Sequence, residues 1–145
     1  MANTINNSDD VIDSRDVIER IDELEGERND LSSALSEAQE SDSPAQLVGE
    51  LQRSLEEWDD ANGDELKALK ALQDEAEGYA PDWKHGCGLV RYSHWVAYVQ
   101  EMLEDIGDLP KDLPHYIEID WDRTAENIKV DYTTVEFDGV EYFVR

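Results

Sequence analysis

Residues 133–145, Thr-Thr-Val-Glu-Phe-Asp-Gly-Val-Glu-Tyr-Phe-Val-Arg, carry the clearest local signal of the chain. Asp138-Gly139 lies between two runs that are rich in β-branched and aromatic residues. Such a dipeptide between two such runs predicts a hairpin with a two-residue type I′ turn. In that register, Phe137 lies opposite Val140 on one face of the hairpin. We therefore expect the chain to end in two antiparallel strands.

The same register places Glu136 directly opposite Glu141 on the other face of the hairpin. Like charges that face each other across two strands destabilise a sheet by some tenths of a kcal/mol. A hairpin selected for stability alone would more often carry lysine or threonine at these positions. The pair is a first indication that the protein displays negative charge for a purpose.

The residues before the hairpin predict a small mixed module. We expect a short strand at Leu89-Val90 and a helix from Ser93 to about Ile106, which Gly107 ends. A second strand is expected over residues 116–119, followed by a short helix that Asp120 caps. The large aromatic residues at helical spacing are expected in the core of this module: Trp83, Trp95 and Trp121.

Between residues 13 and 40, apolar residues recur at alternating steps of four and three, as in a coiled-coil seam. A proline at position 44 predicts a new helix start, and Asn62-Gly63 predicts a further helix end before a third segment that closes near Gly78. The helices are expected to pack as antiparallel neighbours or across a dimer. The expected seam positions are Val17, Ile21, Leu24, Leu31 and Leu35, with Arg28 and Ala38 in the same register.

These patterns predict an α+β protein in three parts. Residues 1–12 are expected to form a disordered terminus, because they are polar and exposed at the chain end. Residues 13–78 form an acidic, coiled-coil-like helical arm. Residues 79–145 form a compact module of two helices and a short antiparallel sheet that ends in the hairpin.

The charge balance excludes several classes of function. The chain of 145 residues holds 37 acidic and 12 basic residues, a net charge of −25, and the greater excess lies before position 79. Direct binding of nucleic acid is excluded because a phosphate backbone would be repelled and no basic surface could release its counterions. Binding to an anionic membrane surface is disfavoured for the same reason. The partner is expected to be a protein.

The remaining composition argues against a cofactor or a catalytic centre. A single cysteine, Cys87, cannot form an intramolecular disulfide and fits a reducing compartment, and no signal peptide or membrane span is visible, so we expect a cytoplasmic protein. His85 and Cys87 are too few ligands for zinc. Asp120 and Asp122 could hold a divalent cation, but capping is the commoner role at a helix start. We expect no metal and no enzyme activity.

The C-terminal residues resemble a known family. The run from Trp95 to Gly107, the run from Leu113 to Ile128, Asp131-Tyr132 and the closing Tyr142-Phe-Val-Arg145 are similar to the C-terminal part of ArdA antirestriction proteins. The resemblance covers about 50 residues, 95–145, and residues 1–78 do not share it. It implies a protein of a phage or other mobile element that imitates the charge of DNA to block type I restriction-modification enzymes.

Our leading hypothesis is therefore a DNA-mimicking inhibitor that occupies the basic groove of a bacterial defence complex, of the restriction-modification or CRISPR kind. The alternative is a coiled-coil homodimeric adaptor whose acidity only confers solubility. A metal-dependent enzyme is the weakest of the three. The acidic residues expected to contact the partner are Glu101, Glu104, Asp105, Asp108, Asp112, Glu118, Asp122, Glu126, Asp131, Glu136 and Glu141.

Overall fold

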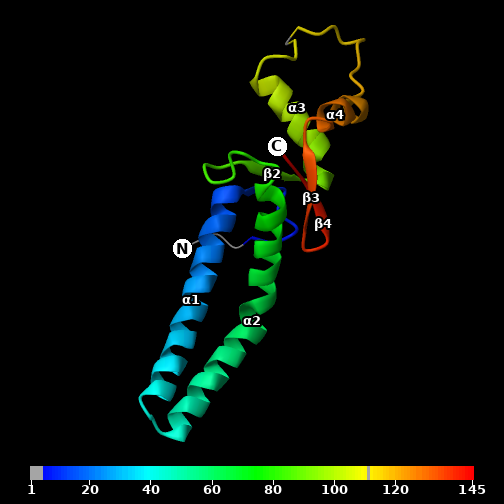
Figure 1. Cartoon of the computed structure of the whole chain (residues 1–145). Coiled ribbons are helices and arrows are strands. Elements are labelled where there is room, and N and C mark those ends of the chain that lie inside the picture. The colour runs from blue at the N-terminus through cyan, green and yellow to red at the C-terminus, as the bar shows by residue number, and fades with distance from the viewer. Residues whose placement is uncertain (1–4, 111) are drawn as a thin grey trace.

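A long helical hairpin dominates the shape of the protein. The computed structural model describes residues 5–110 and 112–145. Helix α1 (Ser14–Glu40) and helix α2 (Ala45–Glu77) run antiparallel and project from one side of a sheet, while the remaining helices lie on its other side (Figure 1). The α+β class and the helix predicted over residues 13–40 are confirmed.

The sheet has four antiparallel strands in the order β1-β2-β4-β3. They are β1 (Val11–Asp13), β2 (Gly88–Arg91), β3 (Thr133–Phe137) and β4 (Val140–Val144). The predicted hairpin is confirmed with its register, because Glu136 pairs with Glu141 across β3 and β4. Asp138 and Gly139 have φ of 49° and 82°, the left-handed backbone that a type I′ turn requires at both central residues.

The second side of the sheet carries two short helices. A 3₁₀ turn (Tyr92–His94) leads into α3 (Trp95–Asp105), and α4 (Trp121–Lys129) packs against α3. The predicted cap of α4 is confirmed, since the Asp120 carboxylate accepts a hydrogen bond from the backbone N–H of Arg123 at 3.1 Å. The predicted helix end is also confirmed, because Gly107 has a φ of 77°.

Strand alternation divides the core into two parts. Leu89, Tyr142 and Val144 face the base of the helical hairpin, where they join a core that includes Trp83. Val90 and Phe143, their neighbours along the strands, face a second core around Trp95 under α3 and α4. Since side chains alternate between the two faces of a strand, β2 and β4 are buried on both sides. The protein is thus three layers: helical hairpin, sheet, and helix pair.

A buried serine joins the hairpin to the sheet. Ser14, the first residue of α1, is fully buried. Its hydroxyl donates to the carbonyl oxygen of Trp83 and accepts from the N–H of Cys87, both at 2.8 Å. Its own N–H donates to the Cys87 carbonyl at 2.9 Å. These bonds fix the start of α1 against the segment that enters β2.

The N-terminal prediction is wrong for the residues that the structure describes. We expected disorder up to residue 12, but Ile5 and Ile12 are buried in the first core and β1 pairs with β2. Tyr142 donates its hydroxyl hydrogen to the Asp9 carbonyl at 2.7 Å, and Arg91 donates to the Asn7 carbonyl at 2.8 Å. These partners lie more than 80 positions away, so local polarity could not reveal them. Residues 1–4 lie outside the described part of the chain.

The helix end predicted at Asn62-Gly63 is also wrong. Helix α2 continues through this dipeptide to Glu77. Residues on both sides of it are held by α1: the indole N–H of Trp58 donates to Glu27 at 3.1 Å, and Leu66 packs on the first core. Contacts with another helix routinely override the weak local preference of a single glycine.

The strand predicted over residues 116–119 does not form. The segment belongs to the loop between α3 and α4, away from the sheet (Figure 1). Tyr116 and Ile117 are 76% and 45% exposed. No neighbouring strand reaches them in the described residues, so β propensity alone could not build a strand there.

The two predicted helix starts differ by one or two residues from those of the structure. Pro44 is the N-cap residue that precedes α2, and it makes no side-chain cap bond. Ser93 lies within the 3₁₀ turn, and His94 is the residue that precedes α3.

The predicted seam of α1 is used inside the chain. Val17, Ile21 and Leu24 are buried against α2 and the sheet, whereas Leu31 and Leu35, farther out along the hairpin, are half-buried. Arg28 occupies its seam position by turning outward, where its guanidinium pairs with Asp59 of α2 at 2.9 Å. The hairpin is therefore well packed near the sheet and loosely packed toward its tip.

Replacement of Ser14 by alanine should lower the free energy of unfolding by about 1–3 kcal/mol, because it leaves the Trp83 carbonyl and the Cys87 N–H without their partner. Urea unfolding followed by circular dichroism measures the change. Ser36→Ala is the matched control on the exposed face of α1, where we expect a change within about 0.5 kcal/mol. Equal effects of the two substitutions would contradict the role assigned to Ser14.

Leu24→Ala should destabilise the protein by about 2–5 kcal/mol, since it leaves a cavity in a close-packed core. Leu35→Ala removes the same atoms from the loosely packed half of the hairpin and should cost less than half as much. Thermal unfolding at several protein concentrations compares the two variants. A dependence of the Leu24 effect on concentration would mean that the seam packs between chains instead.

Candidate functional site

The predicted acidic residues are all on the surface. Each of the eleven carboxylates expected to contact a partner is exposed. They occupy three places: the end of α3 with the loop that follows it, the exposed side of α4 with the β-hairpin, and the short connection after α4. In sequence order, the first place holds Glu101, Glu104, Asp105, Asp108, Asp112 and Glu118; the second holds Asp122, Glu126, Glu136 and Glu141; the third holds Asp131.

The structure brings three of these carboxylates around one hollow. Asp122 and Glu126 of α4 and Glu141 of β4 line a pocket of about 320 Å³. Its aromatic lining includes Trp95 and Phe143, whose rings lie 5.0 Å apart in an edge-to-face arrangement. Carboxylates that are far apart in sequence thus share an aromatic floor. Tyr92, Val96, Ala125 and Lys129 complete the lining.

A cation of the chain already lies in this hollow. The ammonium nitrogen of Lys129 is 5.4 Å from the centroid of the Phe143 ring and 3.0 Å from a Glu126 oxygen. A second cation lies beside the rim, where the Arg91 guanidinium is 5.2 Å from the Tyr92 ring centroid. Aromatic faces attract cations at such distances. The arrangement is suited to positive groups rather than to anions.

Metal binding is not supported in the described residues, where no group of three or more His, Cys, Asp or Glu side chains is placed to hold an ion. Asp120 is engaged as the cap of α4. Burial raises the pKa of the Cys87 thiol, opposed by a hydrogen bond with Ser14, so this cysteine is not activated as a nucleophile.

The helical hairpin carries a larger negative charge than the module. Residues 14–77 hold 20 acidic and six basic side chains. Four of those carboxylates lie in ion pairs: Glu23 and Glu65 with Arg20, Asp59 with Arg28, and Glu25 with Lys70. Within the described residues, the other 16 have no cationic partner, and the hairpin presents them to solvent or at its half-buried margins.

Three helices end in acidic residues. The last turns of α1, α2 and α3 contain no basic residue. A carboxylate near a helix C-terminus opposes the negative end of the helix dipole, at a cost of about 0.3–1 kcal/mol each. Acidic residues at these three helix ends therefore lower the stability of the helices. The residues concerned are Glu37, Glu40, Asp74, Glu75, Glu77, Glu104 and Asp105.

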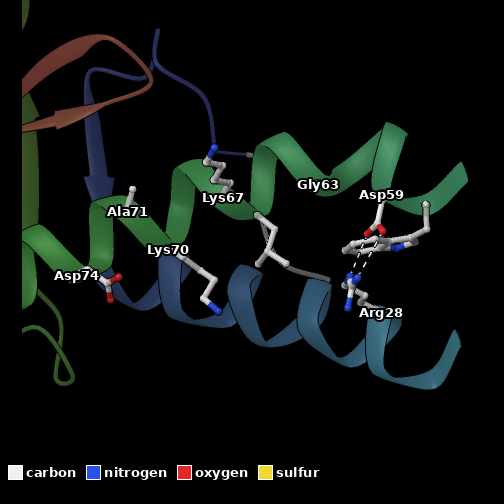
Figure 2. A pocket seen from close by; sticks show the side chains of 9 residues that line it. Arg28, Asp59, Gly63, Lys67, Lys70, Ala71 and Asp74 are labelled. Carbon is white, nitrogen blue, oxygen red and sulfur yellow. Dashed lines mark hydrogen bonds and ion pairs between the residues drawn. The ribbon is translucent and has the colours of Figure 1, made fainter. Parts of the chain in front are cut away.

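The negative surface is interrupted at one groove of the hairpin. Figure 2 shows Arg28 paired with Asp59 at one end of it, and Lys67 and Lys70 on the neighbouring turns of α2. Three of the six basic residues of the hairpin line this groove. Arg28 neutralises Asp59 there, and Lys67 and Lys70 add positive charge, so this side of α2 contributes less to the negative field than the tip of the hairpin does.

Reasoning from sequence missed the pocket itself. Asp122, Glu126 and Glu141 were predicted as separate surface charges, and Trp95 only as a core residue. The spacing of Glu126 and Lys129 at i and i+3 could have revealed their ion pair. The approach of β4 to α4 depends on the sheet order, which no local pattern contains.

Comparison of the chain with family models, with curated proteins and with solved structures gives no match. Of the helices in residues 5–110 and 112–145, none has the length and the apolar run that crossing a bilayer requires.

The opposed glutamates of the β-hairpin allow a direct measurement of how much stability the protein loses by placing like charges side by side. Glu136→Gln and Glu141→Gln should each raise the free energy of unfolding by roughly 0.2–1 kcal/mol, because either one removes a like-charge contact across β3 and β4. Glu118→Gln, in the loop before α4, removes the same charge without an opposed partner and should change stability less. Urea unfolding at low salt compares the three variants. A smaller gain for the two strand variants than for Glu118→Gln would contradict the repulsion.

Proposed function

We propose that the protein is a DNA-mimicking inhibitor that binds the DNA-binding groove of a bacterial defence complex and blocks access of DNA. The observation that carries the proposal is the placement of carboxylates where they cost stability. Acidic residues end α1, α2 and α3, and Glu136 opposes Glu141 in the hairpin. Solubility alone would be met by charges at neutral positions, so the costly positions indicate selection for the field itself.

The charge density of the hairpin supports this proposal. Helix α1 has 27 residues and is therefore roughly 40 Å long at 1.5 Å per residue. A duplex of that length carries about 24 negative charges. The hairpin carries a net excess of 14 acidic side chains over a similar length. A basic groove shaped for a duplex would thus meet more than half of the usual charge on a rod-like scaffold.

The resemblance of residues 95–145 to ArdA antirestriction proteins points in the same direction. It suggests a type I restriction-modification enzyme as the first target to test. The long hairpin of residues 14–77 lies outside that resemblance, and it carries most of the net negative charge.

The alternative, a coiled-coil adaptor, has weaker support. Its seam would have to pair with another helix, yet Val17, Ile21 and Leu24 are buried inside the chain. The half-buried Leu31 and Leu35 are the seam residues that remain for a partner. An adaptor of this kind also gives no reason for acidic residues at three helix ends.

Competition with duplex DNA tests the proposal. Purified protein should displace a labelled duplex from a type I restriction-modification enzyme at low salt and lose that ability as salt is raised, because exposed charges are screened. A variant with Glu37→Gln and Glu40→Gln should be more stable than the natural chain and compete less well. Failure of the natural chain to displace DNA from restriction-modification and CRISPR complexes at low salt would contradict the proposed function. If the variant with both substitutions competes as well as the natural chain, the hairpin tip is not part of the binding surface.

A further inference from the structure

We propose that the protein forms a symmetric homodimer through the outward face of α2, with two copies of this helix crossing antiparallel at Gly63. This face includes the groove of Figure 2, a space of about 510 Å³ lined by residues 58–74 of α2 and by Arg28 of α1. It is distinct from the predicted seam of α1, whose first residues are buried inside the chain. The inference goes beyond the proposed function and does not rest on it.

The charges on this face are arranged symmetrically about Gly63. Glu56 and Asp59 lie seven and four residues before the glycine. Lys67 and Lys70 lie four and seven residues after it. Residues three and four apart are neighbours on a helix surface, so these five positions form one stripe along α2, of which Figure 2 shows the part from Asp59 to Lys70. One half of the stripe is acidic and the other half is basic.

A second copy of α2 complements this stripe when it runs in the opposite direction. With the two glycines facing each other across a two-fold axis, Glu56 lies opposite Lys70 of the partner subunit. In the same register, Asp59 lies opposite Lys67 of the partner subunit. A two-fold contact repeats each pair, so the crossing gains four pairs of opposite charge, about 6 Å and about 10 Å on either side of the axis. A parallel pair of helices would instead bring each charge against its own copy.

The four charged side chains are available for these contacts, because all of them are exposed. The ion pairs of the described residues include neither Glu56 nor Lys67. Lys70 lies 3.8 Å from a carboxylate of α1, which is a long contact. Asp59 is held in the groove by Arg28 at 2.9 Å, and a carboxylate has room to accept from a second base.

Gly63 allows a close approach of the two helices. Glycine is less favourable than alanine inside a helix, yet a Cβ built at Gly63 would meet no atom within 4 Å, so the single chain does not require glycine there. Small residues let two helix backbones approach closely. Gly26 and Gly49 have similar open space, and Gly63 is the one at the centre of the charged stripe. Half-buried Leu66 beside it offers apolar surface for the second helix to cover.

Other partners match this face less well. A wholly acidic surface would be repelled by Glu56 and Asp59, and a wholly basic one by Lys67 and Lys70. The partner has to carry both signs in the reverse order and to be narrow enough to reach Gly63. The chain's own α2 meets both requirements.

The overall charge sets the conditions in which the dimer is expected. Each copy carries a net charge of −25, so two copies repel each other at low salt. At an ionic strength of about 0.15 M the Debye length is about 8 Å. Repulsion between distant parts of the two copies is then screened, whereas the pairs inside the contact are shielded less. Dimerisation is therefore measured at that ionic strength.

Sedimentation equilibrium of the full chain over a range of concentrations tests the proposal. The natural chain should show a reversible equilibrium between monomer and dimer. Glu56→Lys and Lys70→Glu should each weaken dimerisation by at least about tenfold, because each places like charges opposite each other at two contacts. An equimolar mixture of these two variants should dimerise again, because opposite charges then face each other at every contact between the two different chains.

Glu118→Lys and Arg123→Glu are the matched controls for this mixture. They change the net charge by the same amounts, but they lie in the loop before α4 and in α4, on the other side of the sheet. Alone or mixed, they should dimerise as the natural chain does. A natural chain that stays monomeric up to its solubility limit, variants of the stripe that dimerise like the natural chain, or a mixture that does not recover would each overturn the proposal.

Gly63→Ala separates the stability of the helix from that of the dimer. In the monomeric chain it should raise the urea midpoint, as Gly26→Ala should, because alanine favours a helix and a Cβ meets no obstacle at either site. Only Gly63→Ala should weaken dimerisation, by about tenfold, since the added methyl groups keep the crossing helices apart. Equal dimerisation of the two variants would overturn the proposal. None of these measurements involves a DNA-binding enzyme, so their failure is distinct from failure of the proposed function.

Discussion

The hydroxyl of Ser14 lies at the junction on which the arrangement of the protein depends. It bonds to the backbone on both sides of the segment 83–87, so the first turn of α1 and the start of β2 are held as one unit. Strand β1, immediately before α1, pairs with β2 in the same region. Beside this junction, Val17 and Ile21 of α1 and Leu72 of α2 are buried in the first core together with residues of the sheet. The hydrogen bonds of Ser14 and this apolar packing together attach the acidic hairpin to the sheet.

Negative charge and packing are divided along the length of the molecule. The base of the hairpin and the two central strands supply the buried residues, with β2 and β4 covered on both faces. The tip of the hairpin, the end of α3 and the exposed face of β3 and β4 supply much of the charge, and the end of α2 adds exposed carboxylates at the base itself. The stability lost by charge display at those positions is offset by a core that excludes acidic side chains altogether. This division is the physical basis for reading the acidity as functional.

The pocket beside α4 adds geometry to that charge. Its floor belongs to the second core, and its rim comes from α4 and β4, which that core brings together. Bulk charge attracts any cationic surface, with little selectivity between them. The hollow brings carboxylates from α4 and β4 to one place on that surface.

The sequence by itself determined the elements whose signals are local. The β-hairpin around Asp138-Gly139, the first long helix, the caps at Asp120 and Gly107 and the acidic surface all follow from neighbouring residues, and the structure bears them out. Only the tertiary structure decided the rest. Residues 5–13 are ordered by partners far away in the sequence, on β2 and β4. Helix α2 continues through Gly63 because α1 supports it, and residues 116–119 form no strand because no strand lies beside them in the described residues. Each carboxylate of the pocket could be predicted from the sequence as an exposed residue. That Asp122, Glu126 and Glu141 lie close together could not, because contacts between distant segments are fixed by packing rather than by local preference.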